Sequence, residues 1–252
     1  MSAFTLTTET MEGFTRIIIF ALIPVLTMVA GGMAATWRKP GRGLRSLILH
    51  FAAGVVFSVV GVEILPDIIK NHLPGVTIIG FVLGFVVMVG IRKLTEGVEK
   101  KEIKPNADNL PWSLLTGVGV DIIIDGLLLG IGFAAGSTEG ILLAVALSLE
   151  LLSLGMATAT ELGELSHNKK RTRLLILALA ALFFISAVVG ATVLQNASHN
   201  LMDGVLSFGL SALLFLVTEE LLKEAHEEEE TIWHTSAFFG GFLLFVILGM
   251  YV

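Results

Sequence analysis

The sequence predicts an all-α integral membrane protein with eight transmembrane helices, and three observations lead to that prediction. Hydrophobic residues make up 54% of the 252-residue chain, and the mean hydropathy of +0.86 lies far outside the range of a soluble domain. Apolar runs of about 20 residues, the length that crosses a ~30 Å hydrocarbon core as a helix, recur eight times. Basic residues gather in alternate connections between these runs. We therefore expect a single transmembrane domain over residues 1–252.

Short polar or turn-forming segments separate the expected helices. The helices are expected at about 14–37, 44–66, 74–94, 111–135, 139–164, 172–195, 203–223 and 232–252. Prolines and glycines, which end helices, mark breaks such as 38–41, 72–75 and 105–106. The chain has no Cys, so a disulfide framework and a thiolate metal site are both excluded. These tight connections predict one compact helical bundle.

The distribution of basic residues predicts the orientation of the bundle. Most of the Lys and Arg residues fall in the connections at 38–45, 92–109, 166–173 and 223–231, whereas the other side holds only Arg16 and Lys70. The positive-inside rule then makes the first group of connections cytoplasmic. The protein is expected in the cell (inner, cytoplasmic) membrane with both termini extracytoplasmic. The polar N-terminus lacks the features of a signal peptide and is expected to be retained.

The second and seventh helices form an internal repeat. Residues 50–67 align without a gap on residues 207–224, and the alignment places Phe51 on Phe208 and Glu63 on Glu220. Under the predicted topology these two helices run in opposite directions, so the repeat is inverted. Many secondary transporters have this architecture and bind substrate at the midplane between their related halves. The expected arrangement is therefore an inverted 3+2+3 bundle with helices four and five at the centre.

Three carboxylates stand at the midpoints of the two central helices. Asp121 and Asp125 are four residues apart and share one helix face, and Glu150 lies midway along the next, antiparallel helix. Ser153, one turn beyond Glu150, can add a hydroxyl oxygen. An ionisable residue at the bilayer centre costs about 2.5–3.5 kcal/mol on insertion scales and is functional by default. Without a Lys or Arg at that depth, these acids require protons or a cation.

Further acids flank this central group. Glu63 and Asp67 lie toward the outer end of the second helix and are expected to form an entrance. The inner end is expected to form an exit that contains Glu219, Glu220, Glu224, Glu161 and His226. The alternative for the flanking groups is hydration at the helix ends. The alternative for the central three is neutral carboxylic acids that hydrogen-bond between helices.

Four segments resemble motifs of the ZIP family of zinc and iron transporters. Residues 121–126 resemble the family's fourth-helix His-Asn-x-Pro-Glu-Gly, and residues 149–155 its fifth-helix His-Glu-x-Pro pattern. The segments at 63–67 and 219–224 are similar to its motifs in helices two and seven. In this register Asp125 stands in place of the family's Glu ligand, Asp121 in place of a His, and Glu150 is retained in kind. No His remains within the membrane, which implies one metal site in place of a pair.

We therefore expect transport of a divalent metal ion of the zinc, iron or manganese class by alternating access. Asp121, Asp125, Glu150 and Ser153 would coordinate the ion, with Glu63 and Glu220 on either side. The ion is a substrate, no cofactor is expected, and the protein is expected not to be an enzyme. The expected partners are the ion and the lipid bilayer, a homodimer is left open, and nucleic acid is not expected.

Three other functions are compatible with the same acids. A proton- or sodium-coupled carrier of an organic solute would use them for the coupling ion alone, and a non-transporting metal sensor would bind the ion without moving it. An intramembrane hydrolase is disfavoured because the aspartates share one helix and do not face each other across two. Flux measurements separate these classes.

Overall fold

The computed structural model describes residues 3–38, 41–99, 112–166, 168–194, 197–226 and 231–251, and within these ranges it contains helices and no strand. The elements are α1 (Ala3–Trp37), α2 (Arg42–Val59), η1 (Val60–Ile64), α3 (Leu65–Asn71), α4 (Pro74–Glu99), α5 (Trp112–Ala135), α6 (Ser137–Ser166), α7 (Lys169–Leu194), α8 (His199–Phe215), η2 (Leu216–Leu221), α9 (Leu222–Ala225) and α10 (Ile232–Gly249). Eight helical stretches are long and apolar enough to cross a membrane. The predicted all-α fold with eight spans is confirmed.

Most helices extend past their predicted ends. The second predicted span, 44–66, continues as α2, η1 and α3 to Asn71, and the seventh, 203–223, begins earlier, at His199. The third continues to Glu99. Hydropathy detects only the part of a helix that matches the hydrocarbon core, whereas backbone hydrogen bonding continues into the polar residues beyond it.

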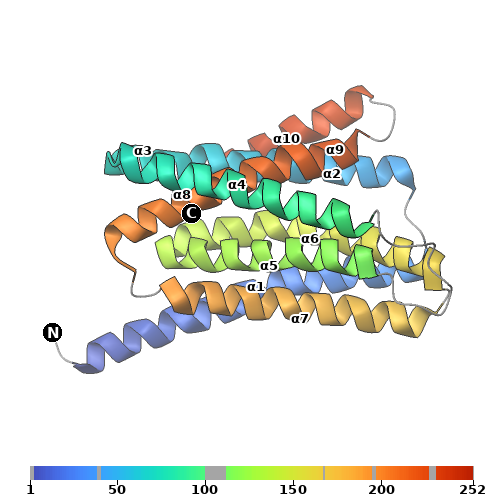
Figure 1. The fold of residues 1–252 in the computed structure, drawn as a ribbon, viewed down its shortest axis with the longest axis horizontal. Helices are drawn as coiled ribbons and strands as arrows, with labels where there is room; N and C mark the ends of the chain where they lie inside the picture. The colour runs from blue at the N-terminus through green and yellow to red at the C-terminus, as the bar shows by residue number, and fades with distance from the viewer. Residues whose placement is uncertain are drawn as a thin grey trace.

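The helices form two layers (Figure 1). In one layer α1 packs along α6 and α5 along α7, and in the other α10 packs along α2 and α4 along α8. The layers meet mainly where α2 crosses α6 and where α8 and α4 approach α5. The central helices α5 and α6 therefore lie in one layer and face α2 and α8 of the other.

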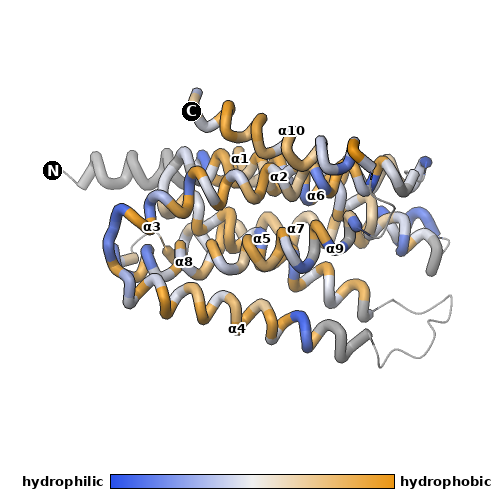
Figure 2. Tube along the Cα trace, turned by 90° about the horizontal axis from the view of Figure 1, so that it is seen from above, coloured by the Kyte–Doolittle hydropathy of each residue, from blue (hydrophilic) through white to orange (hydrophobic). Residues whose placement is uncertain are grey.

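Apolar side chains cover the flanks of the bundle. Figure 2 shows hydrophobic residues along the length of the helices and hydrophilic residues mostly near their ends. The α4 helix is the clearest case, because its exposed residues include Ile78, Ile79, Val82, Leu83, Phe85 and Val86. Such a surface requires a lipid environment or a protein partner, and the bilayer is the environment that eight such helices indicate.

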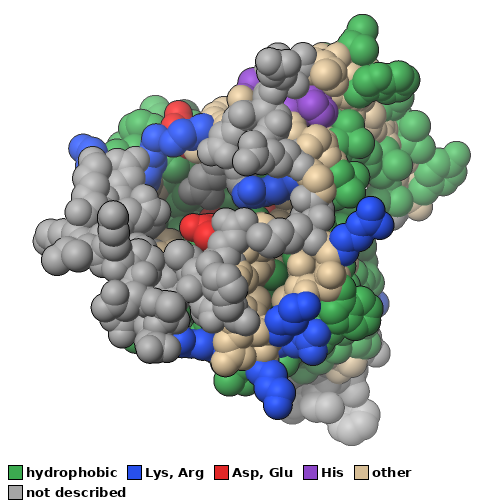
Figure 3. Space-filling view, turned by 90° about the vertical axis from the view of Figure 1, so that its right-hand side faces the viewer, with side chains coloured by type: hydrophobic (Ala, Val, Ile, Leu, Met, Phe, Trp, Pro, Cys, Tyr) green, Lys and Arg blue, Asp and Glu red, His purple; other side chains and the backbone are tan. Residues whose placement is uncertain are grey.

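The two ends of the bundle differ in charge. We call the basic end the one where α1 and α6 finish and α2, α7 and α10 begin, and the other the opposite end. Figure 3 looks onto the basic end and shows Lys and Arg side chains distributed around it. The connections that are rich in Lys and Arg in the sequence are at this end.

The layer of α2, α4, α8 and α10 is built as an inverted repeat. A Cβ atom on Gly241 of α10 would clash with the carbonyl oxygen of Phe51 on α2, and a Cβ atom on Gly84 of α4 would clash with that of Phe208 on α8. Gly84 and Gly241 are separated by 157 positions, as are Phe51 and Phe208. The two close contacts are therefore the same contact made once in each half, which supports the repeat found in the sequence.

The layer of α1, α5, α6 and α7 also contains a pair of equivalent close contacts, one in each half of the repeat. A Cβ atom on Gly155 of α6 would clash with the carbonyl of Met28 on α1, and one on Gly130 of α5 would clash with that of Ala187 on α7. Gly130 and Gly155 are therefore equivalent positions of the two central helices, α5 and α6. Because α5 and α6 run antiparallel, the two-fold axis that relates the halves passes between them.

Both repeated helices contain a π-helical turn at the same place. The turn is η1 in one half and η2 in the other, and the 157-residue spacing superimposes Val60–Ile64 on residues 217–221 of η2. Pro66 explains the first turn in part, because a proline has no N–H to donate to the preceding turn. Nothing in the sequence explains the second. Single π turns inside helices occur often at functional sites, and these two hold Glu63, Glu219 and Glu220.

Candidate metal site

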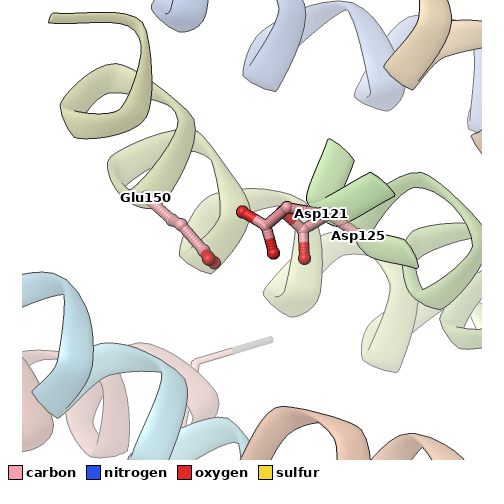
Figure 4. Close-up of side chains that lie close together, drawn as sticks. All are labelled: Asp121, Asp125 and Glu150. Carbon is pink, nitrogen blue, oxygen red and sulfur yellow. The ribbon is translucent and has the colours of Figure 1, made fainter. Parts of the chain in front are cut away.

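Three carboxylates from two adjacent helices converge in the middle of the bundle. Asp121 and Asp125 of α5 and Glu150 of α6 each offer a carboxylate oxygen, and these oxygens lie within 4.8 Å of one another. Figure 4 shows the three side chains directed toward a common point. Asp125 is fully buried, Glu150 is 3% exposed and Asp121 is partly exposed. The predicted convergence of these residues at one depth is confirmed.

The local structure of α5 and α6 fixes this geometry. The two helices are joined by Gly136 alone, so they lie antiparallel and in contact. Both are regular α-helices with no proline inside, and the four-residue spacing of Asp121 and Asp125 stacks them one turn apart. On its other side α5 is held against α7 through Gly126 and Gly130. Close backbone packing therefore leaves little freedom to the positions that carry the acids.

Two of the acids occupy equivalent positions across the two-fold axis. Asp125 lies five residues before Gly130, and Glu150 lies five residues before Gly155. Since the two glycines make equivalent contacts, Asp125 and Glu150 are symmetry mates that meet near the axis. Asp121 has no acidic counterpart, because its equivalent on α6 is Ala146. The site therefore combines a symmetric carboxylate pair with one additional acid on the side nearer the basic end.

Ser153 lies on the same face of α6 as Glu150, three residues farther along. It is 1% exposed, and its hydroxyl oxygen has no hydrogen-bond partner in the described part of the chain. Ser148, by contrast, donates its hydroxyl hydrogen to the carbonyl of Ala144 at 2.6 Å, the usual arrangement of a serine within a helix. A buried hydroxyl without that bond retains its oxygen lone pairs for another ligand.

A small cavity lies just beyond the acids toward the opposite end. It has a volume of about 20 Å³, enough for roughly one water molecule. Its walls come from both layers and are apolar apart from Glu63 of η1; they include Val59, Leu128, Leu143, Leu206 and Leu213. Leu128 follows Asp125 by one turn of α5, so the cavity and the acids succeed each other along the bundle. The structure thus places Glu63 between the central acids and the opposite end.

Asp67, the second predicted entrance residue, lies near the end of the same helix. Its carboxylate accepts a hydrogen bond from Nζ of Lys70 at 3.0 Å, and its side chain is 35% exposed. The pair is thus part of the surface at the opposite end.

At the basic end the structure describes the side chains of three of the predicted exit residues, Glu161, Glu219 and His226. Glu219 forms an ion pair with Arg92 of α4, an interaction that the sequence did not indicate. Glu161 is exposed on α6. The side chains of Glu220 and Glu224 lie outside the described residues.

His226 belongs to a group of three imidazoles at the basic end. Its ring lies 5.3 Å from that of His50, which in turn stacks on His234 with the ring centroids 5.3 Å apart. His50 and His234 are 4% and 8% exposed, whereas His226 is exposed. The His50 ring is therefore packed between the rings of His226 and His234.

Asp203 is a buried acid that the sequence interpretation missed. It is 2% exposed and accepts a hydrogen bond from Asn71 of α3 at 2.5 Å. It is the first residue of the predicted helix at 203–223, and a carboxylate at a helix end is ordinarily hydrated. The one available signal was its four-residue spacing from His199, which puts both side chains on one face of α8.

The arrangement of the central acids limits what they can do chemically. Three ionised carboxylates in a low dielectric repel one another unless protons or a cation compensate them. A divalent ion removes most of that repulsion, and carboxylate and hydroxyl oxygens are ligands for divalent ions such as Mn²⁺ and Fe²⁺. The site is therefore compatible with a metal.

No protein-family model matches the chain, and no curated protein matches it either.

Proposed function

We propose that the protein transports a divalent transition-metal ion across the membrane through the carboxylate site between α5 and α6. The observation that carries this proposal is the convergence of Asp121, Asp125 and Glu150, with oxygens within 4.8 Å of one another, inside a bundle of eight apolar helices. A slight closure brings such oxygens onto one ion with metal–oxygen distances of about 2.0–2.2 Å. Ser153 supplies a fourth oxygen.

The symmetry of the fold supports transport over a static metal site. Inverted repeats place a substrate site at the midplane and allow it to open alternately to either side. Here Asp125 and Glu150 lie near the axis that relates the halves, so the ion would contact equivalent ligands from both directions. The π-helical turns in both halves, η1 and η2, are irregular segments at which the flanking helices can rearrange.

The flanking acids define a route for the ion. Glu63 borders the cavity next to the site, and Asp67 lies farther out, so these two residues would recruit the ion. Glu220 and Glu224 would receive it at the basic end. By the positive-inside rule the basic end would face the cytoplasm and both termini would be extracytoplasmic. The resemblance to ZIP transporters implies that the ion moves inward, from the opposite end to the basic end.

The resemblance of 121–126 and 149–155 to ZIP motifs agrees with this function. The ligand set differs from the family pattern in using oxygen donors alone at the midplane. Zinc generally prefers imidazole and sulfur, whereas carboxylates suit manganese and ferrous iron. The proposed ion belongs to the zinc, iron or manganese class, and the oxygen ligands favour the harder members of that class.

Uptake into liposomes tests the proposal. The purified protein is reconstituted, and uptake of Zn²⁺, Fe²⁺, Mn²⁺ and Cd²⁺ is measured in parallel for the wild type, Asp125→Asn and Ser148→Ala. We expect saturable uptake that Asp125→Asn abolishes and Ser148→Ala preserves, since Ser148 is bonded within its own helix. Full uptake by folded Asp125→Asn protein would refute the site. Uptake of none of the four ions would favour the solute carrier or the sensor.

A further inference from the structure

We propose that Asp203 and His199 form a second metal site at the opposite end of the bundle, with Asn71 orienting the carboxylate. The site binds a divalent transition-metal ion through one carboxylate oxygen and one imidazole nitrogen, with water completing the coordination. It is distinct from the three central acids, and its role in delivering the ion to them rests on the proposed transport function.

The first argument is the burial of Asp203. Its side chain is 3% exposed, and Oδ2 has no hydrogen-bond partner among the described residues. A buried carboxylate oxygen that accepts no hydrogen bond is strongly destabilising unless a cation approaches it. The other oxygen, Oδ1, is occupied by the Nδ2 donor of Asn71 at 2.5 Å.

The second argument is the distance to His199. Its Nε2 atom lies 3.8 Å from Oδ2 of Asp203, which is too long for a hydrogen bond. A zinc-like ion binds nitrogen at about 2.0–2.1 Å and carboxylate oxygen at about 2.0–2.2 Å. Two such ligands in tetrahedral geometry are separated by roughly 3.4 Å. A shift of a few tenths of an ångström would therefore let one ion bridge the two atoms.

The third argument is the support around the pair. Ser198 caps the start of α8 by accepting a hydrogen bond from the backbone N–H of Leu201 at 3.3 Å, which fixes the first turn. The four-residue spacing of His199 and Asp203 then places both side chains on one face. The donor from Asn71 fixes the carboxylate plane, as outer partners of metal ligands commonly do.

The position suits an entry site. The His199 side chain is 74% exposed whereas Asp203 is buried, so the imidazole can meet an ion in solution and the carboxylate can hold it inside. Leu206, three residues after Asp203, lines the cavity that contains Glu63. His199 and Asp203 therefore lie on the face of α8 that leads toward the central acids. They are at the part of that face nearest the opposite end of the bundle. Two protein ligands give weak binding, which permits release to the next site.

Zinc binding in an Asp125→Asn background isolates this site, because that substitution removes a central ligand. Zn²⁺ bound to the detergent-solubilised protein is measured by equilibrium dialysis and elemental analysis. His199→Ala is the test variant, Asp203→Asn tests the second ligand, and His72→Ala is the matched control. His72 is another histidine at the same end, and its Nδ1 is hydrogen-bonded to the Ile69 carbonyl at 2.6 Å.

We expect His199→Ala and Asp203→Asn each to weaken zinc binding by about tenfold or more, because each removes one of two protein ligands. His72→Ala should leave binding unchanged. Equal binding by all four proteins would overturn the proposal. So would an Asp203→Asn protein that melts at a lower temperature but binds zinc as before, because Asp203 would then only tie α8 to α3. The outcome is independent of flux through Asp125, so failure of the transport proposal would be visible separately.

Discussion

The two halves of the layer of α2, α4, α8 and α10 share one backbone arrangement but differ in the residue placed next to the acids of their π-helical turns. Gly84 and Gly241 make equivalent contacts, and η1 and η2 occupy equivalent turns. Position 92 in the first half corresponds to position 249 in the second, by the same 157-residue spacing. The first is Arg92, which binds Glu219, and the second is Gly249, where a Cβ atom would lie 3.1 Å from an oxygen of Glu63.

This difference shows how a symmetric fold can treat its two ends unequally. At the basic end a guanidinium on α4 compensates an acid of the π-helical turn. At the opposite end the equivalent position on α10 has no side chain, which leaves room next to Glu63. In our proposal the ion passes Glu63 on its way to the central acids, whereas Glu219 is already paired with Arg92. The helix packing follows the repeat, whereas the residues placed next to the two π-helical turns do not.

The largest expected effect concerns the symmetric pair itself. Asp125→Asn and Glu150→Gln should each weaken metal binding by more than about a hundredfold, because losing a direct ligand exceeds the roughly 10–100-fold effect of losing an outer partner. The exchanged variant, Asp125→Glu combined with Glu150→Asp, should keep most of the affinity because the two positions are equivalent. Calorimetric titration with Mn²⁺ measures all three. An exchanged variant as defective as Asp125→Asn would contradict the equivalence.

The equivalent glycines should show equal effects on stability. Gly84→Ala and Gly241→Ala would each force two helices apart, at about 1–3 kcal/mol for overpacking. Gly240→Ala is the matched control because a Cβ atom there meets nothing within 4 Å. Thermal unfolding in detergent compares the three. A destabilisation confined to one of the two equivalent glycines would mean that the contacts are not related by the repeat.

A cation introduced at position 249, next to Glu63, tests the difference between the two ends. Gly249→Arg would place a guanidinium beside Glu63, as Arg92 is placed beside Glu219. We expect the rate of metal uptake to fall about tenfold, which corresponds to a free-energy difference of about 1.4 kcal/mol. Gly249→Ala controls for the side-chain volume. Uptake by the Arg variant equal to that of the Ala variant would show that the charge next to Glu63 does not matter.

The smallest expected effect is that of breaking the ion pair at the basic end. The side chains of Arg92 and Glu219 are 34% and 42% exposed, so solvent screens their attraction and Arg92→Gln should change the free energy of unfolding by at most about 1 kcal/mol. A double-mutant cycle with Glu219→Gln measures the coupling. Coupling well above that value would show that the pair is far less solvated than its exposure indicates.

Several parts of the fold and site followed from local sequence rules. The eight spans were predictable because crossing a bilayer requires about 20 apolar residues in succession. Asp121 and Asp125 could be placed on one face from helical periodicity, and Glu150 opposite them because the turn predicted between the two helices is very short. The repeat was recognisable because 50–67 and 207–224 align without a gap.

Other features depend on contacts between distant segments. Asp203 is buried because α3 and α8 meet there, and its partner Asn71 is 132 positions away. Glu219 is paired because α4 brings Arg92 to it across 127 positions. The grouping of His50, His226 and His234 also requires the ends of three separate helices to come together. These contacts join residues that are far apart in the chain, so no pattern within one segment predicts them.

The sequence by itself determined the number of helices, their apolar faces and the acids at their midpoints, because hydropathy and helical periodicity act within one segment. Only the tertiary structure decided which acids outside the central group are paired with a base and which are buried. Those outcomes depend on how helices cross, and the crossings are set by glycines that allow one backbone to touch another.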